Sequence, residues 1–166
     1  MANEKIVYIA LGSNLGDRAA MLARAEQAMG DAGVRVLRRS SLYTTEPVDA
    51  PPQPWFLNSV VEAETSLMPV QLLHVLAGIE RGLGRRRITP RGPRTLDLDI
   101  LLYGSSVIKT PELQVPHPGL QNRRFVLAPL AELAPGLRHP VLHKSIAELL
   151  ANTTDQGKIR RWDPAG

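Results

Sequence analysis

Two aspartates, Asp97 and Asp99, lie close together in the stretch GPRTLDLDILLYG, where their type and spacing could support chemistry. The apolar residues Leu96, Leu98 and Ile100 alternate with them, a period of two that is typical of a strand with one face in a core. Alternate residues of a strand lie about 7 Å apart and point the same way, so both carboxylates are expected on the other face. Their repulsion, on the order of 3 kcal/mol at an effective dielectric constant of about 20, calls for a cationic partner.

Arginines gather in the ten residues before this strand, namely Arg85, Arg86, Arg87, Arg91 and Arg94. The glycines and prolines among them indicate a loop. Paired carboxylates beside several guanidinium groups suit a Mg²⁺–triphosphate complex, in which the carboxylates hold the metal and the arginines neutralise the remaining phosphate charge. The sequence therefore predicts a phosphoryl-transfer site. The alternatives are solvated surface arginines and an exposed strand face, with Arg94 as a simple counter-ion to the aspartates.

A third group of candidates lies in the stretch VPHPGLQNRRF. Pro116 and Pro118 restrict the backbone on both sides of His117, which is as consistent with a structural role as with a catalytic one. Arg123 and Arg124 stand near the start of a predicted helix, where positive charges oppose the helix dipole. A bound anion would remove this conflict, so the segment is a candidate phosphate contact.

The proline-rich stretch PVDAPPQPWFLNSVV leads into a predicted strand that places Phe56 and Asn58 on one face. A flat ring for stacking, beside an amide that both donates and accepts hydrogen bonds, suits a planar heterocycle, and Phe125 could supply a second ring. The alternative role for Phe56 is core packing. The stretch GSNLGDR lacks the Lys and the Ser or Thr of a phosphate-binding loop, so we expect Ser13 or Asn14 to cap the helix that follows.

The composition limits the remaining functions. A chain of 166 residues with 43% hydrophobic residues can bury one substantial core, so we expect a single domain over residues 1–166. The absence of cysteine excludes disulfides and thiolate metal sites and leaves hard cations such as Mg²⁺. No apolar run reaches the roughly 18 residues of a membrane span, and no signal-peptide pattern is present, so we expect a cytoplasmic location. The net charge of +4 favours a polyanionic partner, but an aromatic content of 4% argues against RNA binding by base stacking.

Periodicity along the chain predicts an α+β fold. Strands are expected over 5–11, 34–43, 55–65 and 95–103, and helices are expected between residues 14 and 33, over 68–81, over 124–133 and in SIAELLA. The core elements have the order β-α-β-β-α-β, the ferredoxin-like arrangement in which an antiparallel sheet carries two helices on one face. Later elements would be C-terminal additions. The second face of the sheet is then expected to be free for chemistry.

A resemblance to a known family rests on four stretches: LGSNLGDR, LYTTEPVDAPPQPWFLNSVVEAET, GPRTLDLDILLYG and VPHPGLQNRRFVLAPLAEL. In their order, from residue 5 to about 135, the chain resembles the 6-hydroxymethyl-7,8-dihydropterin pyrophosphokinases of folate synthesis. The combination of PRTLDLDI with a later VPHP and NRRF makes this resemblance specific. It implies a ferredoxin-like α+β domain that transfers the β,γ-diphosphate of ATP to the hydroxymethyl group of the pterin and leaves AMP.

The resemblance also implies roles for individual residues. Asp97 and Asp99 would bind two Mg²⁺ ions that bridge the phosphates of ATP. The expected contacts of ATP are Glu80, Arg85, Arg87, Arg94, His117 and Arg123, of which Arg85 and Arg94 would also be catalytic. The expected contacts of the pterin are Thr45, Phe56, Asn58 and Phe125, with the two rings on either side of it. The chain departs from the family pattern at Arg91, where many relatives carry an aromatic residue.

The implied partners are the small molecules ATP and pterin, and we expect a monomer that binds neither nucleic acid nor a membrane. From the residues alone, functions of two other classes stay open. A basic ferredoxin-like module could bind RNA, with the aspartate pair incidental, and would then show a steep salt dependence and form no AMP. A metal-dependent phosphohydrolase could use the same carboxylates and would release phosphate from ATP without any pterin.

Overall fold

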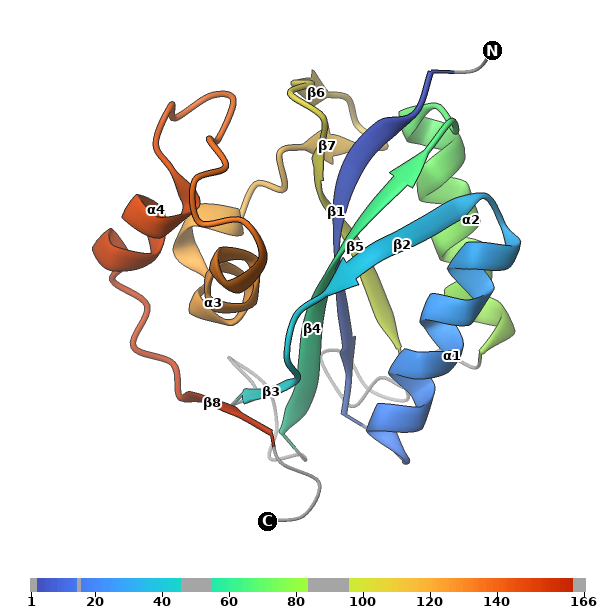
Figure 1. The fold of residues 1–166 in the computed structure, drawn as a ribbon, viewed down its shortest axis with the longest axis horizontal. Coiled ribbons are helices and arrows are strands. Elements are labelled where there is room, and N and C mark those ends of the chain that lie inside the picture. Colours follow the sequence, from blue (N-terminus) through green and yellow to red (C-terminus); the bar gives the residue numbers. More distant parts are fainter. Residues whose placement is uncertain (1–2, 15, 46–54, 84–95, 163–166) are drawn as a thin grey trace.

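An antiparallel sheet forms the middle layer of the molecule (Figure 1). The computed structural model describes residues 3–14, 16–45, 55–83 and 96–162. Along the sheet the strands follow the order β5-β1-β4-β3-β8, and β2 also pairs with β4. These strands are β1 (Lys5–Ser13), β2 (Val34–Arg39), β3 (Tyr43–Thr45), β4 (Phe56–Thr65), β5 (Asp97–Tyr103) and β8 (Ile159–Arg161). The long strands β1 and β4 pair along their whole length and form the centre of the sheet.

Helices cover both faces of this sheet (Figure 1). The pair α1 (Arg18–Asp31) and α2 (Pro69–Gly82) packs on one face, and the pair α3 (Arg124–Leu133) and α4 (Ile146–Asn152) lies against the other. The predicted ferredoxin-like order, with the first two helices on one face, is confirmed. The expectation that the second face is free is wrong for the part that α3 and α4 cover, because Tyr8, Val60 and Leu102 belong to a second core there.

The first core lies between the sheet and the pair α1 and α2. Val7, Ile9 and Leu11 of β1 point into it and are at most 1% exposed. Leu98 and Ile100 of β5 join them, which confirms the alternation predicted from the sequence. Full burial of one such aliphatic side chain stabilises a fold by about 1.5–3 kcal/mol, so this face supplies much of the free energy of folding.

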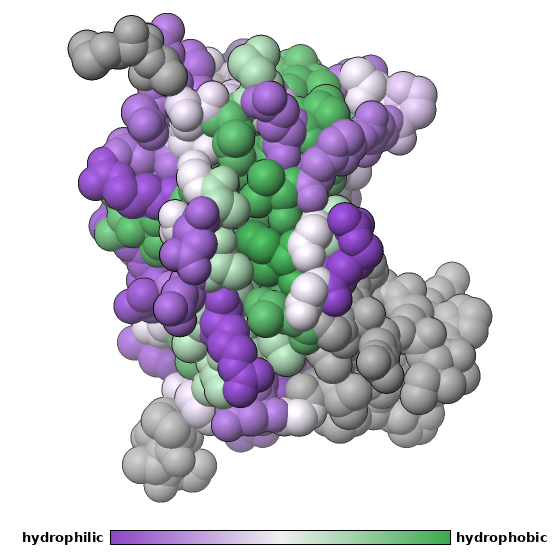
Figure 2. Space-filling model, turned by 90° about the vertical axis from the view of Figure 1, so that its right-hand side faces the viewer, coloured by the Kyte–Doolittle hydropathy of each residue, from purple (hydrophilic) through white to green (hydrophobic). Residues whose placement is uncertain are grey.

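The outer side of α1 and α2 keeps a band of hydrophobic surface between hydrophilic flanks (Figure 2). The partly buried Met21, Leu73 and Ile79 pack against the first core, and Met68 and Val70 near the start of α2 are exposed. The two helices therefore do not close completely over their apolar residues. None of the helices in the described part of the chain combines the length and the apolar composition needed to cross a bilayer.

The single strand expected over 34–43 is divided into β2 and β3 at Ser40. The backbone N–H of Ser40 donates to the Val60 carbonyl (2.9 Å), but its hydroxyl Oγ accepts from Val60 N (3.0 Å). A side-chain oxygen thus takes the place of a backbone carbonyl in the ladder, and the chain leaves regular strand geometry there. The short strand β3 that follows pairs with β4 on one side and with β8 on the other.

The strand β5 contains one residue more than the part of β1 with which it pairs. Tyr8 lies opposite Leu102 and Ile9 lies opposite Ile100, which leaves Leu101 without an opposite residue. As a result Leu101 and Leu102 both belong to the second core, whereas Ile100 belongs to the first. A bulge of this kind re-aims the side chains of a strand.

The segment between β5 and α3 brings His117 to the strand that carries the aspartates. A small separate sheet is formed by β6 (Ile108–Lys109) and β7 (Gln114–Val115), and the short 3-10 helix η1 (Leu120–Asn122) leads into α3. His117 N donates to the Leu101 carbonyl (2.9 Å), so the backbone of the histidine is fixed to β5.

Candidate active site

Asp97 and Asp99 occupy the first and third positions of β5, and the strand alternation directs both to the second face of the sheet. Leu98 between them is 6% exposed and belongs to the first core. In the ladder Asp97 lies opposite Gly12, and Asp99 lies opposite Ala10. Both opposite residues are small, and Asp97 is half-buried whereas Asp99 is exposed.

A carboxylate from α2 fixes the backbone between the two aspartates. Leu98 N donates a hydrogen bond to Glu80 Oε2 (2.8 Å). Among the described strands β5 is at the edge of the sheet, so its outward N–H groups need partners other than a strand, and Glu80 supplies one. The resemblance places Glu80 among the ATP contacts, which stays a prediction. In the structure its carboxylate positions the strand that carries Asp97 and Asp99.

His117 interacts electrostatically with Asp99 and Arg123, which brings three of the predicted site residues together. Its Nδ1 accepts a hydrogen bond from Gly119 N (3.1 Å), so the neutral ring carries its proton on Nε2. Burial lowers the pKa of His117, the Asp99 carboxylate raises it and the Arg123 guanidinium lowers it, with a net decrease from 6.5. The imidazole is therefore mainly neutral at pH 7 and can donate a hydrogen bond from Nε2 to an anion.

Arg123, which precedes α3, holds its guanidinium over an aromatic ring and against a glycine. Its Cζ lies 5.8 Å from the centroid of the Phe125 ring, within the range of a cation–π contact. A Cβ atom at Gly119 would lie 2.7 Å from Arg123 Nε, so any larger residue there would displace the guanidinium. The contact connects a predicted ATP residue with a predicted pterin residue.

The predicted pterin contacts Asn58, Thr45 and Phe56 form a compact group on the same face of the sheet as the aspartates. Asn58 Nδ2 donates to Thr45 Oγ1 (2.5 Å), and both residues are buried. A Cβ atom at Gly12 would lie 2.6 Å from Asn58 Oδ1 and 3.7 Å from the Phe56 ring, so the amide lies directly over the glycine. Phe56 is half-buried and belongs to neither apolar core of the described residues, which argues against core packing as its role.

Gly12 joins the aspartates to this second group. Asp97 of β5, Gly12 of β1 and Asn58 of β4 form one row across three adjacent strands. Neighbouring strands lie about 4.8 Å apart, so the backbones of Asp97 and Asn58 are separated by about 10 Å. Between them the sheet presents a residue without a side chain. A carboxylate pair and an amide therefore face the same space.

The helix starts near the site differ from the sequence prediction. The carboxylate of Asp17 caps α1 by accepting a backbone N–H of the first turn, whereas Ser13 and Asn14, the expected caps, are buried. At the start of α3, where the sequence predicted a bound anion, the protein supplies a carboxylate itself. Asp155 Oδ2 accepts a hydrogen bond from Arg124 N (2.8 Å). The conflict between the arginines and the helix dipole is thus reduced before any ligand binds.

Sequence reasoning assigned no role at the site to Gly12, Gly119 or Asp155. A glycine inside a strand is itself a signal that another group approaches the backbone closely, and Gly12 fits this signal. Asp155 has no comparable local signal, because its partner Arg124 lies 31 residues earlier in the chain.

Several predicted residues lie outside the described part of the chain, namely Arg85, Arg87, Arg91 and Arg94. Within the described part, no group of three or more His, Asp or Glu side chains is placed to hold a metal ion. The pair Asp97 and Asp99 nevertheless fits Mg²⁺, because this ion is usually bound through one or two carboxylates and completes its shell with water and phosphate oxygens of the substrate.

The side chains on the second face of the sheet suit the two substrates of a group transfer. Paired carboxylates suit metal-bound phosphates, His117 and Arg123 suit further phosphate oxygens, and Asn58 with its neighbouring ring suits a heterocyclic acceptor. On a ferredoxin-like α+β sheet, this set of groups is that of a nucleotide-dependent transferase. Residues 8–135 match the family model for 7,8-dihydro-6-hydroxymethylpterin-pyrophosphokinase (HPPK). The chain belongs to this family, the ATP-dependent pyrophosphokinases of folate synthesis.

Individual relatives agree with the family. The 2-amino-4-hydroxy-6-hydroxymethyldihydropteridine pyrophosphokinase of Bacillus subtilis is 46% identical over 158 residues, which cover 95% of this chain and 90% of that protein. The folic acid synthesis protein fol1 of Pneumocystis carinii is 42% identical over 153 residues, 92% of this chain, but the chain spans 21% of that longer protein. The HPPK-DHPS of Plasmodium falciparum, crystallised with pterin and p-hydroxybenzoate, shares the fold with a TM-score of 0.71 at 16% identity, over 90% of this chain and 42% of that one.

Proposed function

We propose that this chain, as one domain over residues 1–166, transfers the β,γ-diphosphate of ATP to the hydroxymethyl oxygen of 6-hydroxymethyl-7,8-dihydropterin and releases AMP. The row of Asp97, Gly12 and Asn58 is the observation that carries the proposal. It sets the backbones of Asp97, whose carboxylate suits metal-bound phosphates, and of Asn58, whose amide suits a heterocycle, about 10 Å apart on one face of the sheet. The two substrates of a diphosphate transfer could then be bound side by side on that face.

On the pterin side, Asn58 would bind the edge of the heterocycle, and Phe56 and Phe125 would stack on its two faces. Thr45 accepts one N–H of the Asn58 amide and so fixes the direction in which the amide oxygen points. A fixed amide can pair its oxygen with an N–H donor of the ring, which selects a heterocycle of one hydrogen-bonding pattern. The rings would add stacking area without selecting a particular edge.

On the phosphate side, Asp97 and Asp99 would hold two Mg²⁺ ions. When bound, these ions would polarise the phosphate oxygens and offset their charge. The Nε2–H of His117 and the guanidinium of Arg123 would contact phosphate oxygens directly. Further phosphate contacts in the proposal are Arg85, Arg87 and Arg94, with Arg85 and Arg94 offsetting the charge that develops on the leaving AMP. Glu80 would lie near the nucleotide end of ATP.

Position and charge would then account for most of the catalysis. The hydroxymethyl oxygen would attack the β-phosphorus in line with the bond to the bridging oxygen of AMP, which breaks as the new P–O bond forms. Holding two reactants in this geometry can remove about 7–11 kcal/mol from a barrier. The protein's own residues would bind and orient both substrates on the second face of the sheet.

The test is a product assay with purified protein. We expect AMP and the pterin diphosphate to form from ATP when both hydroxymethyl-dihydropterin and Mg²⁺ are supplied, and no AMP when either is omitted. ADP in place of ATP is the matched control, because it has no β,γ-diphosphate to transfer. Release of inorganic phosphate from ATP without pterin would indicate a phosphohydrolase and would overturn the proposal.

The RNA-binding alternative receives no support from the family match or from the relatives. A monomeric state, a cytoplasmic location and the number of Mg²⁺ ions are further parts of the proposal. Light scattering would measure the first, and titration of bound metal in the presence of an inert ATP analogue would measure the last.

A further inference from the structure

We propose that the C-terminal segment 153–162, here called the C-terminal brace, sets the width of the pterin-binding half of the site. It would do so by fixing the start of α3, which carries Phe125, relative to β3, which carries Thr45. The inference rests on the proposed function of those two residues. Asp155 is then a positioning residue that acts through its neighbours and touches no substrate.

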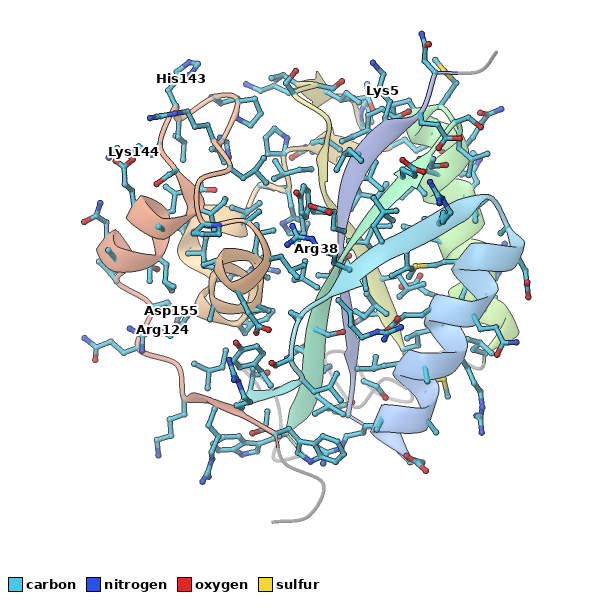
Figure 3. All side chains as sticks on the ribbon, in the orientation of Figure 1. Lys5, Arg38, Arg124, His143, Lys144 and Asp155 are labelled. Atoms are coloured by element: carbon cyan, nitrogen blue, oxygen red, sulfur yellow. The ribbon has the colours of Figure 1, made fainter. Side chains whose placement is uncertain are left out.

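The first attachment of the brace is to the start of α3. Asp155 Oδ2 accepts a hydrogen bond from Arg124 N (2.8 Å), and the two residues lie side by side in Figure 3. Asp155 Oδ1 accepts from Gly157 N (2.8 Å), and Asp155 N donates to Thr153 Oγ1 (3.2 Å), so the carboxylate is held from its own side as well. Phe125 follows Arg124 directly, so this cap fixes the backbone from which the ring extends.

The second attachment of the brace is to β3. Strand β8 adds to the sheet with Ile159 opposite Thr45 and Arg161 opposite Tyr43 (Figure 1). Just beyond it, Trp162 N donates to the Leu42 carbonyl (2.8 Å). Because β3 is three residues long, pairing on both sides is what keeps it in strand geometry. Thr45 in turn accepts the hydrogen bond that orients Asn58.

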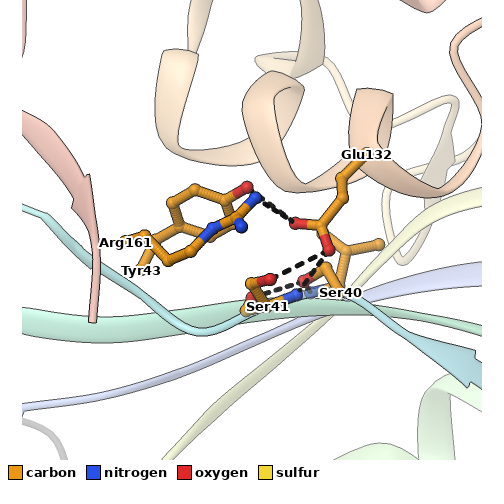
Figure 4. A network of polar contacts seen from close by, with 6 residues as sticks. Ser40, Ser41, Tyr43, Glu132 and Arg161 are labelled. Atoms are coloured by element: carbon orange, nitrogen blue, oxygen red, sulfur yellow. Dashed lines mark hydrogen bonds and ion pairs between the residues drawn. The ribbon is translucent and has the colours of Figure 1, made fainter. Parts of the chain in front are cut away.

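A third connection joins α3 to β3 directly, through the carboxylate of Glu132 (Figure 4). Glu132 Oε2 accepts from the backbone N–H (2.9 Å) and the hydroxyl (3.0 Å) of Ser41, and Glu132 Oε1 accepts from the Tyr43 hydroxyl (2.7 Å). Arg161 of the brace lies 3.7 Å from the same Oε1, with its guanidinium 5.9 Å from the centre of the Tyr43 ring.

These groups are held in one protonation state at neutral pH. Burial by itself raises the pKa of Glu132, but the hydrogen bonds from Tyr43 and Ser41 outweigh it and lower the pKa below its ordinary value. Burial and the hydrogen bond to Glu132 raise the pKa of Tyr43. The carboxylate therefore stays charged and the phenol stays neutral, so the network persists across the physiological range.

The three connections link α3, β3 and the C-terminal brace to one another in pairs. Two sides of a site joined by one contact can pivot, whereas three elements joined in pairs keep a fixed spacing. Phe125 extends from α3 and Thr45 from β3. The helix α3 stays anchored through Val126, Leu127 and Leu130 in the second core, against which Phe125 also packs. Removing the Asp155 hydrogen bond should therefore loosen only the first turn of α3, which carries Phe125, while β5 stays in place.

The experiment compares substrate dependence in two cap variants. For Asp155→Ala we expect KM for the pterin to rise about threefold to tenfold, because the loosened first turn of α3 must be ordered when the pterin binds, at a cost like that of losing a helix cap. KM for ATP should rise by a smaller factor, because Arg123 belongs to the same turn but Asp97, Asp99 and His117 lie on other segments. Ser145→Ala is the matched control, because it removes the N-cap of α4, whose hydroxyl accepts from Glu148 N (3.1 Å), and α4 carries no predicted site residue. The control should lower the melting temperature to a similar extent and leave both KM values unchanged.

A second substitution separates position from stability. Asp155→Asn keeps one of the two acceptor oxygens that Asp155 uses, so it can accept from Arg124 N or from Gly157 N but not from both. It should therefore restore part of the pterin affinity that Asp155→Ala loses, and it carries the test if Asp155→Ala does not fold. An unchanged pterin KM in Asp155→Ala, or the same rise in Ser145→Ala, would contradict the proposed role of the C-terminal brace.

Phe56→Ala distinguishes failure of the brace from failure of the proposed function. If Phe56→Ala weakens the pterin and Asp155→Ala does not, the pterin site stands and the brace is wrong. If neither variant changes the pterin KM, the proposed pterin site is wrong, and the proposed role of the C-terminal brace is wrong as well. The expected result is a rise in the pterin KM of both variants that is larger than any rise in KM for ATP.

Discussion

Side chains alternate between the two faces of the sheet, and the two faces have different roles. Toward α1 and α2, strand β1 presents Val7, Ile9 and Leu11 to one continuous apolar core. Toward α3 and α4 the face is divided, because Tyr8 enters the second core near one end of β1 and Gly12 lies in the site near the other. Packing occupies the whole of the first face but only part of the second.

The difference shows that neighbouring residues of one strand can have separate physical roles. In β5, Leu98 contributes to the first core, while Asp97 and Asp99 face the site. Stability and activity should therefore be separable by single substitutions one residue apart. Substitutions on the two faces test this contrast.

The largest effect is expected where the two faces meet, in β5. Asp97→Ala or Asp99→Ala should lower turnover at least about 100-fold and abolish Mg²⁺-dependent nucleotide binding, because the carboxylates hold the metal, while the fold survives. Leu98→Ala should do the reverse and lower the free energy of unfolding by about 2–5 kcal/mol, as deletion of a buried leucine does. AMP formation and denaturant titration measure the two quantities. Near-normal turnover in either aspartate variant would refute the metal assignment.

A smaller effect is expected at Gly12, where the site face has no side chain. Gly12→Ala should raise KM for the pterin about tenfold, because the new Cβ would lie 2.6 Å from Asn58 Oδ1 and push the amide away from its place. Melting temperature should fall, because the displaced Asn58 amide is buried and loses its hydrogen bond to Thr45, which outweighs the preference for alanine over glycine in a strand.

The double variant with Asn58→Ala tests the cause. Without the amide there is nothing for the new Cβ to displace, so Gly12→Ala should have no further effect on pterin affinity in that background. Additive losses in the two variants would mean that Gly12 acts through another residue.

The smallest effect is a change in the titration of His117. Burial lowers the pKa of His117 below its ordinary value in the free protein. A bound triphosphate should raise the pKa where its negative charge exceeds the positive charge of the Mg²⁺ ions beside Asp99, because a net negative charge favours the protonated ring. Nucleotide binding should then take up a proton, and affinity should increase as the pH falls through the interval between the free and bound pKa values.

NMR titration of the imidazole with and without Mg²⁺-nucleotide measures this change. His139, whose pKa is also lowered by burial and by His143, is the matched control because it lies in the loop between α3 and α4, outside the site. An unchanged His117 pKa in the bound protein would argue that the ring does not contact the nucleotide.

Much of the site-bearing sheet could be predicted from local patterns. The alternation of Leu96, Leu98 and Ile100 with the aspartates predicted both the strand and the face, and β5 has this arrangement. The split at Ser40 was not predictable, because it depends on a hydroxyl that contacts Val60 on another strand.

The second core and the brace show where sequence reasoning stopped. Strand β1 reads KIVYIALGS and is apolar at odd and even positions, a signal of burial on both faces that the interpretation of a free second face overlooked. The roles of Asp155 and Glu132 depend on contacts with residues far away in the chain, at Arg124 and Ser41, and no local pattern reports such a partner.

Leu101, the extra residue of β5, acts as a phase shift in the two-residue period of the strand. Before Leu101 the even-numbered Leu98 and Ile100 face the first core, whereas after it the even-numbered Leu102 faces the second core. A residue inserted on the site side of Leu101 would turn the aspartates toward the apolar helices, whereas a change beyond it would leave them where they are. The bulge at Leu101 thus lets the residues beyond it change without changing the face to which Asp97 and Asp99 point.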